Sequence, residues 1–201
     1  MSADIATYLS PAHADRRGDR LVYLMGASGS GKDTMLRCLR STLLPHEPVL
    51  VAHRYITRPS GADEASVSLS EAEFERRVLM GCFALHWASH GLRYGIGVEI
   101  DAWLASGAAV VLNGSRTHLA AAHARYPGMV AVEVVADAEV LAQRLAARGR
   151  ETPAQIAARL RQASLPLEWP AGRTITRLPN NGAPEIAARQ LLTLVRGRMA
   201  V

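Results

Sequence analysis

Short apolar runs alternate with amphipathic stretches along most of the chain. The runs at 108–112 and 129–135 are continuous or nearly so, which is the pattern of parallel strands buried on both faces. We expect strands at 21–25, 49–56, 83–87, 108–112, 129–135 and 174–177. Helices are expected from the segment after the first strand to about 44, and at 70–81, 98–106, 116–126, 137–148, 153–164 and from 184 onward, with a turn at 91–95.

Strands that alternate with helices through short connections predict a three-layer α/β fold, in which helices flank a parallel sheet. The 201 residues are enough for one hydrophobic core, so we expect a single domain, 1–201, with a variable lead at 1–20. The chain has no apolar run long enough to cross a bilayer and no basic-then-apolar start, so a cytoplasmic location is expected.

A glycine-rich segment follows the first strand and has the Gly-x-x-x-x-Gly-Lys spacing of a phosphate-binding P-loop. Its glycines let several backbone N–H groups turn toward one anion, which the positive end of the next helix also faces. Lys32 is the only lysine of the chain and is expected to reach the outer phosphates. The predicted nucleotide-binding residues are Gly26, Ala27, Ser28, Gly29, Ser30, Gly31, Lys32, Asp33 and Thr34.

Asp33 stands where this motif usually has a serine or threonine that ligates magnesium. A carboxylate is also a hard oxygen ligand for Mg²⁺, either directly or through a water molecule. An acid in the first turn of a helix is also favoured by the helix dipole, with no metal involved. The sequence leaves both roles of Asp33 open, and they are compatible.

The net charge of +5 comes from arginines that are scattered over several elements and form no single basic run. This distribution favours polyphosphate ligands over a nucleic-acid surface. Arg144, Arg148 and Arg150 end one expected helix, and Arg159 lies on the next, which begins at Thr152-Pro153. Such a helical pair could close over a phosphoryl group as a lid, or it could be an Arg-rich solvated surface.

The order of the motifs resembles the guanylate kinase family. After the P-loop come Thr57-Arg58-Pro59, Gly91-x-x-Tyr94-Gly95, and Arg148-Gly149-Arg150-Glu151 followed by Arg159. The resemblance implies a P-loop NTPase fold of guanylate kinase type, with an acceptor-binding insertion at 53–97 and a helical lid at 144–164.

The same resemblance assigns roles to individual residues. It implies that Lys32, Arg148 and Arg159 are catalytic and that ATP is the phosphoryl donor, with Mg²⁺ as cofactor. It also implies that Arg58 grips the acceptor phosphate and that Tyr94 contacts it.

The departures from guanylate kinases concern the acceptor. Leu85 and Ile96 stand where that family has the polar residues that read guanine, and Asn113-Gly114-Ser115 replaces its acidic Asp-x-Asp. A guanine base against Leu85 and Ile96 would leave polar groups unpaired, at about 1–3 kcal/mol per group. The sequence therefore disfavours guanine as the acceptor.

These departures occur together in the ribose 1,5-bisphosphate phosphokinases, which the chain closely resembles in its Gly-Ser-Gly-Lys-Asp-Thr, Asn-Gly-Ser-Arg and Arg-Gly-Arg-Glu motifs. The resemblance implies transfer of the γ-phosphoryl group of ATP to the 1-phosphate of ribose 1,5-bisphosphate, in phosphonate breakdown. Such an acceptor oxygen is already ionised, so no general base is required. The candidate acceptor-binding residues are Arg54, Arg58, Arg93, Tyr94, Asn113 and Arg116.

Two other functions stay open at this point. One is a guanylate kinase or another small-molecule phosphate kinase with an altered acceptor pocket. The other is a non-catalytic guanylate kinase-like interaction module, a class that typically loses the P-loop. The intact Gly31-Lys32 and the pair Arg148 and Arg159 argue against the module.

Overall fold

The structure is a computed structural model that describes residues 18–60, 65–147, 149, 152–167, 169 and 173–199. The strands are β1 Leu21–Gly26, β2 Val49–Val51, β3 Arg54–Ile56, β4 Ser66–Ser68, β5 Phe83–Ser89, β6 Leu92–Gly97, β7 Ala109–Asn113, β8 Val130–Val135 and β9 Ile175–Pro179. The helices are α2 Lys32–Thr42, α3 Glu71–Leu79, α4 Glu99–Ala105, η2 Arg116–His118, α5 Leu119–Arg125, α6 Ala138–Ala147, α7 Pro153–Ser164 and α8 Pro184–Met199.

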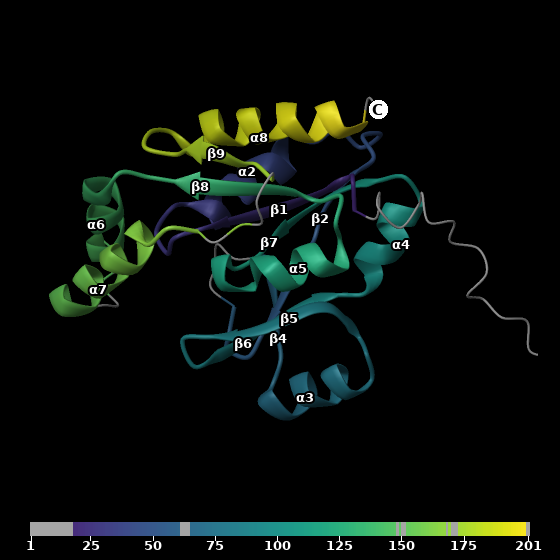
Figure 1. The fold of residues 1–201 in the computed structure, drawn as a ribbon, viewed down its shortest axis with the longest axis horizontal. Coiled ribbons are helices and arrows are strands. Elements are labelled where there is room, and N and C mark those ends of the chain that lie inside the picture. The colour runs from purple at the N-terminus through teal and green to yellow at the C-terminus, as the bar shows by residue number, and fades with distance from the viewer. Residues whose placement is uncertain are drawn as a thin grey trace, which may run out of the picture.

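The main sheet has the strand order β2-β7-β1-β8-β9, and all its neighbouring strands are parallel. Helices α2 and α8 cover one face, and α4 and α5 cover the other (Figure 1). The three-layer α/β fold expected from the alternating pattern is therefore confirmed. No helix within the described residues is long and apolar enough to cross a membrane.

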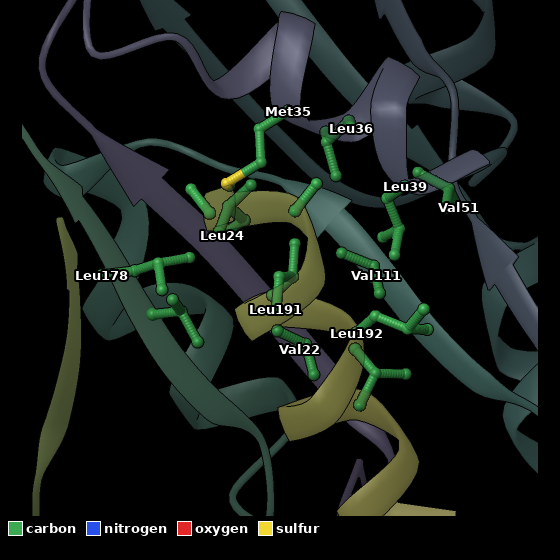
Figure 2. Close-up of a cluster of buried hydrophobic side chains, with 14 of the residues drawn as sticks. Val22, Leu24, Met35, Leu36, Leu39, Val51, Val111, Leu178, Leu191 and Leu192 are labelled. Atoms are coloured by element: carbon green, nitrogen blue, oxygen red, sulfur yellow. The ribbon is translucent and has the colours of Figure 1, made fainter. Parts of the chain in front are cut away.

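Side chains of β1 alternate between two apolar clusters, one on each face of the sheet. Val22 and Leu24 join the cluster with α2 and α8, in which Met35 and Leu191 are fully buried (Figure 2). Tyr23 points to the opposite face and joins the cluster beneath α4 and α5. Burial of β1 on both faces fixes the strand that leads into the P-loop.

A second, four-stranded sheet with the order β4-β3-β6-β5 packs beside the main one and carries α3 (Figure 1). It corrects two sequence predictions. The strand expected at 49–56 is two strands in different sheets, because the chain leaves β7 at Ala52 and turns to pair with β6. The turn expected at 91–95 is mostly strand β6, and the turn itself lies at His90 and Gly91, both with positive φ.

The cross-strand pairing of two aromatic residues explains the second error. Trp87 on β5 stands opposite Tyr94 on β6, and the two rings stack with centroids 5.6 Å apart. Such cross-strand pairs stabilise an antiparallel ladder, and they outweigh the turn propensity of the glycines at 91, 95 and 97. Strand β4 was not predicted either.

Candidate active site

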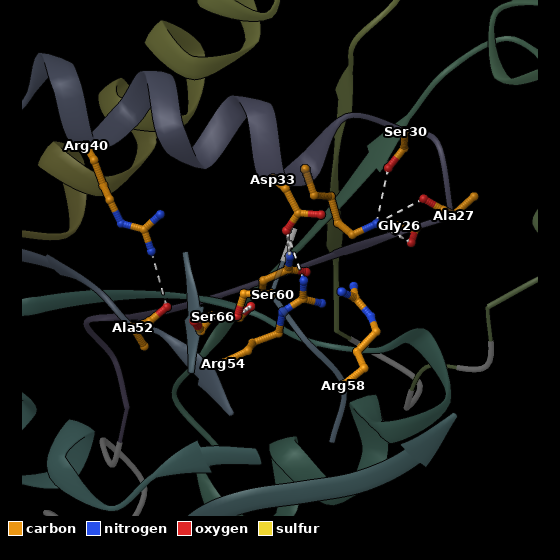
Figure 3. A network of polar contacts seen from close by, with 12 residues as sticks. Gly26, Ala27, Ser30, Asp33, Arg40, Ala52, Arg54, Arg58, Ser60 and Ser66 are labelled. Carbon is orange, nitrogen blue, oxygen red and sulfur yellow. Dashed lines mark hydrogen bonds and ion pairs between the residues drawn. The ribbon is translucent and has the colours of Figure 1, made fainter. Parts of the chain in front are cut away.

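The P-loop connects β1 to α2 and wraps around the ammonium group of Lys32. Lys32 Nζ donates to the carbonyl oxygens of Gly26 at 2.7 Å and Ala27 at 2.9 Å, and contacts Ser30 Oγ at 3.3 Å (Figure 3). Gly31, with φ 87°, is the N-cap of α2. The loop thus places the lysine and the N-terminus of α2 at one point, as anion binding requires.

Asn180, which follows β9, braces this loop from the other side. Its Nδ2 donates to the carbonyl of Ser30 at 2.7 Å, and its side chain is buried. Its own carbonyl accepts from Arg144 on α6 at 2.9 Å. These contacts tie the P-loop to the base of the lid region, and neither contact was predicted from the sequence.

Asp33 lies at the centre of a polar network at the start of α2. Its Oδ1 accepts from Arg54 Nη2 at 3.0 Å (Figure 3). The same oxygen accepts from Asn113 Nδ2 at 2.8 Å. The Arg54 side chain is only 14% exposed and that of Asp33 is 36% exposed, so this ion pair is partly shielded from solvent. The structure therefore joins three predicted site residues from α2, β3 and β7.

Asn113 ends β7 at the carboxyl edge of the parallel sheet, where open α/β sheets bind their ligands. It is 2% exposed, and its Oδ1 has no hydrogen-bond partner among the described residues. A small depression beside it is lined by Asp33, Leu36, Arg40, Ala52, Arg54, Ala65 and Asn113. A buried amide oxygen without a donor is a ready acceptor for a ligand group or for an ordered water.

Tyr23 on β1 fixes the backbone that follows Asn113. Its hydroxyl donates to the carbonyl of Ser115 and accepts from the Ser115 N–H, both at 2.9 Å. Burial raises the pKa of Tyr23 far above its ordinary value, with a smaller opposing effect of the bond to Ser115. The phenol therefore stays neutral and serves as both donor and acceptor for this turn.

Leu85 and Ile96 are buried apolar residues of the second sheet. They are cross-strand partners on β5 and β6, 4% and 0% exposed, and both belong to the cluster beneath α4 and α5. Neither side chain offers a hydrogen bond. The positions that the family resemblance associates with base recognition are thus closed by apolar packing.

The remaining acceptor candidates of the second sheet already have protein partners. The Arg54 guanidinium lies over the Tyr94 ring, 5.7 Å from its centroid. Arg93 pairs with Glu75 and lies 4.7 Å from the centroid of the Phe74 ring. Arg58 donates to the carbonyl of Pro59 at 2.9 Å, and Figure 3 shows its guanidinium turned toward the P-loop side of the network.

Arg116 lies apart from these arginines, at the start of η2. Its guanidinium donates to the carbonyls of Gln162 and Ala163, both at 3.1 Å, and to that of Leu165, all at the end of α7. Its Nε lies 3.3 Å from Oε1 of Glu133 on β8. Sequence reasoning did not select Glu133, although a lone acid inside the apolar run 129–135 was a visible signal.

The lid candidates are only partly covered by the structure. Arg159 lies on α7, which begins with the expected Thr152-Pro153 pair and has a full capping box between Thr152 and Gln155. Arg148 and Arg150 lie outside the described residues. A cavity of about 210 Å³ separates α7 from the P-loop and the end of β8; its lining includes Ala27, Glu133, Val135, Leu160 and Ser164.

The donor set at the P-loop suits one hard cation shared with a phosphate ligand. Within the described parts of the chain, no group of three or more His, Cys, Asp or Glu residues could hold a metal alone. Asp33 supplies a carboxylate and Asn113 an unpartnered amide oxygen close to it. Mg²⁺ prefers one or two such oxygens together with substrate phosphates and waters, so these residues fit it.

No protein-family model matches the chain. It is similar to curated proteins named ribose 1,5-bisphosphate phosphokinase PhnN. The protein of that name from Achromobacter xylosoxidans is 61% identical over 183 residues, which cover 91% of this chain and 95% of the relative. The one from Azotobacter vinelandii is 48% identical over 183 residues, 90% of this chain and 98% of the relative.

Among solved structures, a guanylate kinase from Anaplasma phagocytophilum has the same fold. The TM-score is 0.63 at 16% identity, with 92% of this chain and 87% of that chain covered. At this identity the likeness concerns the fold alone. The sequence identities and this shared fold lead to one conclusion: the chain belongs to the ribose 1,5-bisphosphate phosphokinase family and has a guanylate kinase-like P-loop fold.

Proposed function

We propose that this protein transfers the γ-phosphoryl group of ATP to the 1-phosphate of ribose 1,5-bisphosphate, giving 5-phospho-α-D-ribose 1-diphosphate and ADP in phosphonate catabolism. The observation that carries the proposal is the 61% identity, over 91% of the chain, to a protein named for this acceptor. The apolar pair Leu85 and Ile96 supports it independently, because a sugar bisphosphate has no base to be read.

The donor half of the site is the P-loop. Lys32 Nζ is held by the carbonyls of Gly26 and Ala27, so it is already placed beside the backbone N–H groups of the loop. Phosphate oxygens of ATP would add to these contacts, and the N-terminus of α2 would favour their charge. Arg159 on α7, and Arg148 outside the described residues, would neutralise charge on the transferred group.

The acceptor half uses arginines instead of base-reading groups. Arg54, Arg58 and Arg93 come from β3, the segment after it and β6, and Tyr94 lies under the Arg54 guanidinium. We expect the acceptor phosphates to draw these guanidinium groups from their protein partners, because bidentate bonds to a doubly charged phosphate are stronger. Asn113 Oδ1 would accept a hydrogen bond from a sugar hydroxyl or from a water.

The chemistry then needs positioning more than proton transfer. An oxygen of the acceptor 1-phosphate forms a bond to the γ-phosphorus, and the bond from that phosphorus to the β,γ-bridging oxygen breaks, which releases ADP. The attacking oxygen carries no proton that a base must remove, so alignment and charge neutralisation supply the rate. Mg²⁺ bound near Asp33 would neutralise charge on the phosphates of ATP.

The test is ADP release from ATP and Mg²⁺ with ribose 1,5-bisphosphate, with GMP, and with no acceptor. We expect turnover with ribose 1,5-bisphosphate and background rates in the other two reactions. Turnover with GMP alone would replace the proposal by guanylate kinase activity, and no turnover with any acceptor would favour an interaction module.

A pair of arginine variants makes the acceptor assignment specific. Arg58→Ala should raise KM for the acceptor by about tenfold or more, because a charged hydrogen bond to phosphate contributes about 1.5–3 kcal/mol. Arg76→Ala is the matched control, since Arg76 is 73% exposed and pairs with Glu73 one helical turn away on α3. Equal effects of the two substitutions would remove Arg58 from the acceptor site.

A further inference from the structure

We propose that Arg116 is a positioning residue that fixes the lid helix α7 on the main sheet and so sets where Arg159 stands relative to the donor phosphates. The inference rests on the proposed function for its kinetic consequence, but its structural part stands on contacts alone. Arg116 follows the strand that ends in Asn113, so one short segment serves both the acceptor side of the site and the lid.

The Arg116 guanidinium acts as a C-terminal cap for α7. Gln162 and Ala163 lie in the last turn of this helix, where backbone carbonyls have no intrahelical partner. The Arg116 guanidinium donates to both carbonyls and also to that of Leu165, the C-cap residue. A cation at this position also interacts favourably with the negative end of the helix dipole.

Glu133 is the buried carboxylate that pairs with the Arg116 guanidinium. Its side chain is 10% exposed, and a carboxylate buried to that extent needs a cationic partner. Arg116, itself 18% exposed, lies 3.3 Å away from Oε1, and the more exposed Arg177 lies 3.7 Å away from Oε2. Nε of Arg116 makes no hydrogen bond to any described residue, so Glu133 holds the guanidinium by charge, while its two terminal nitrogens donate to the α7 carbonyls.

The capped end of α7 lies across a cavity from the P-loop. The half of α7 that Arg116 caps faces the cavity of about 210 Å³, with Leu160, Ala163 and Ser164 on one wall and Ala27 of the P-loop on another. A shift of α7 across this cavity would move Arg159 relative to the P-loop. Misplacement by about 1 Å can cost on the order of 100-fold in rate, so the cap has a direct kinetic consequence.

The experiment compares three variants of the full chain. Arg116→Ala removes the cap. Glu133→Gln keeps the shape of the residue 133 side chain but removes the negative charge that pairs with the Arg116 guanidinium. Arg177→Ala is the matched control, because it removes the other cation near Glu133 without touching α7. Hydrogen–deuterium exchange of the peptide 153–164 without ligands, and kcat with separate KM values for ATP and for ribose 1,5-bisphosphate, are measured for each.

We expect exchange in 153–164 to rise about tenfold in Arg116→Ala and by a smaller factor in Glu133→Gln, since loss of a cap eases local opening. We expect kcat to fall about 10- to 100-fold in Arg116→Ala, with KM for the acceptor within about threefold of wild type. Arg177→Ala should resemble wild type in both measurements.

Several outcomes would overturn the inference. Unchanged exchange together with a raised KM for the acceptor would make Arg116 an acceptor ligand, as the family resemblance implied. Exchange that rises equally in β1 and β8 would mean general loss of stability and no specific cap. If wild type shows no turnover with ribose 1,5-bisphosphate, the proposed function fails, whereas the exchange data still decide whether Arg116 holds α7.

Discussion

Replacement of Gly31 by alanine tests how the P-loop is held in shape. Gly31 has φ 87°, a left-handed conformation that costs an L-residue about 1–2 kcal/mol. A Cβ atom at Gly31 would lie 2.5 Å from Nδ2 of Asn180, which donates to the Ser30 carbonyl at 2.7 Å. Asn180 would therefore have to move away and give up this hydrogen bond.

Gly29 provides the matched control for this substitution. Its φ of 86° gives alanine the same backbone strain. A Cβ atom at Gly29 would lie 3.2 Å from the nearest side-chain atom of Leu145 and 3.7 Å from that of Leu141. The lost bond of Asn180 contributes about 0.5–1.5 kcal/mol. We therefore expect Gly29→Ala to lower the free energy of unfolding by about 1–2 kcal/mol and Gly31→Ala to lower it by about 1.5–3.5 kcal/mol.

The assay is guanidinium-induced unfolding of the two single variants, of Asn180→Ala, and of both double variants, without nucleotide. Gly31→Ala and Asn180→Ala remove the same bond, so together they should cost about 0.5–1.5 kcal/mol less than the sum of the single effects. Gly29→Ala and Asn180→Ala should add. If Gly31→Ala is no more destabilising than Gly29→Ala and also adds with Asn180→Ala, the bracing role of Asn180 is refuted.

Three further predictions concern Tyr23, His118 and Asp33. Tyr23→Phe leaves the Ser115 N–H and carbonyl without their partner and should lower the free energy of unfolding by about 1–3 kcal/mol, measured by denaturant titration. Burial, and to a lesser extent the nearby His86, lower the pKa of His118 below 6.5. The unfolded chain therefore binds more protons below that pH, so the free energy of unfolding should fall as the pH drops. His118→Phe should make this fall less steep when unfolding is measured from about pH 7.5 to about pH 5. Asp33→Ala should weaken the magnesium dependence of ADP release, because it removes the carboxylate proposed to position the ion.

Each of these three predictions has an outcome that would contradict it. A stability of Tyr23→Phe equal to that of wild type would mean that water replaces the phenol at Ser115. An unchanged pH slope in His118→Phe would assign the decline to other groups. An unchanged magnesium titration in Asp33→Ala would leave Asp33 with its helix-dipole role and its contacts to Arg54 and Asn113.

Much of the fold could be predicted because its signals are local or periodic. The continuous apolar runs predicted the buried parallel strands β7 and β8, and Thr152-Pro153 predicted the start of α7. The second sheet could not be predicted in full. Its short strands, such as β4, gain their stability from partners elsewhere in the chain, so they have little pattern of their own.

In the candidate site, too, local features could be predicted and contacts between distant residues could not. Gly31 and Lys32 act through the backbone beside them, and the sheet register makes Leu85 and Ile96 cross-strand partners. The contact of Asn113 with Asp33 spans 80 residues, and that of Asn180 with Ser30 spans 150. Only the order of the strands in the sheet brings such residues together.

The sequence by itself determined a parallel α/β core and a P-loop motif with the one lysine of the chain, and it predicted an acceptor region rich in arginine and poor in base-reading groups. Only the tertiary structure decided which task each arginine has: Arg54 pairs with Asp33, whereas Arg116 caps α7 and pairs with Glu133. The physical reason is that a guanidinium group is recognised by whichever carbonyls and carboxylates the fold places around it, and those lie far away along the chain.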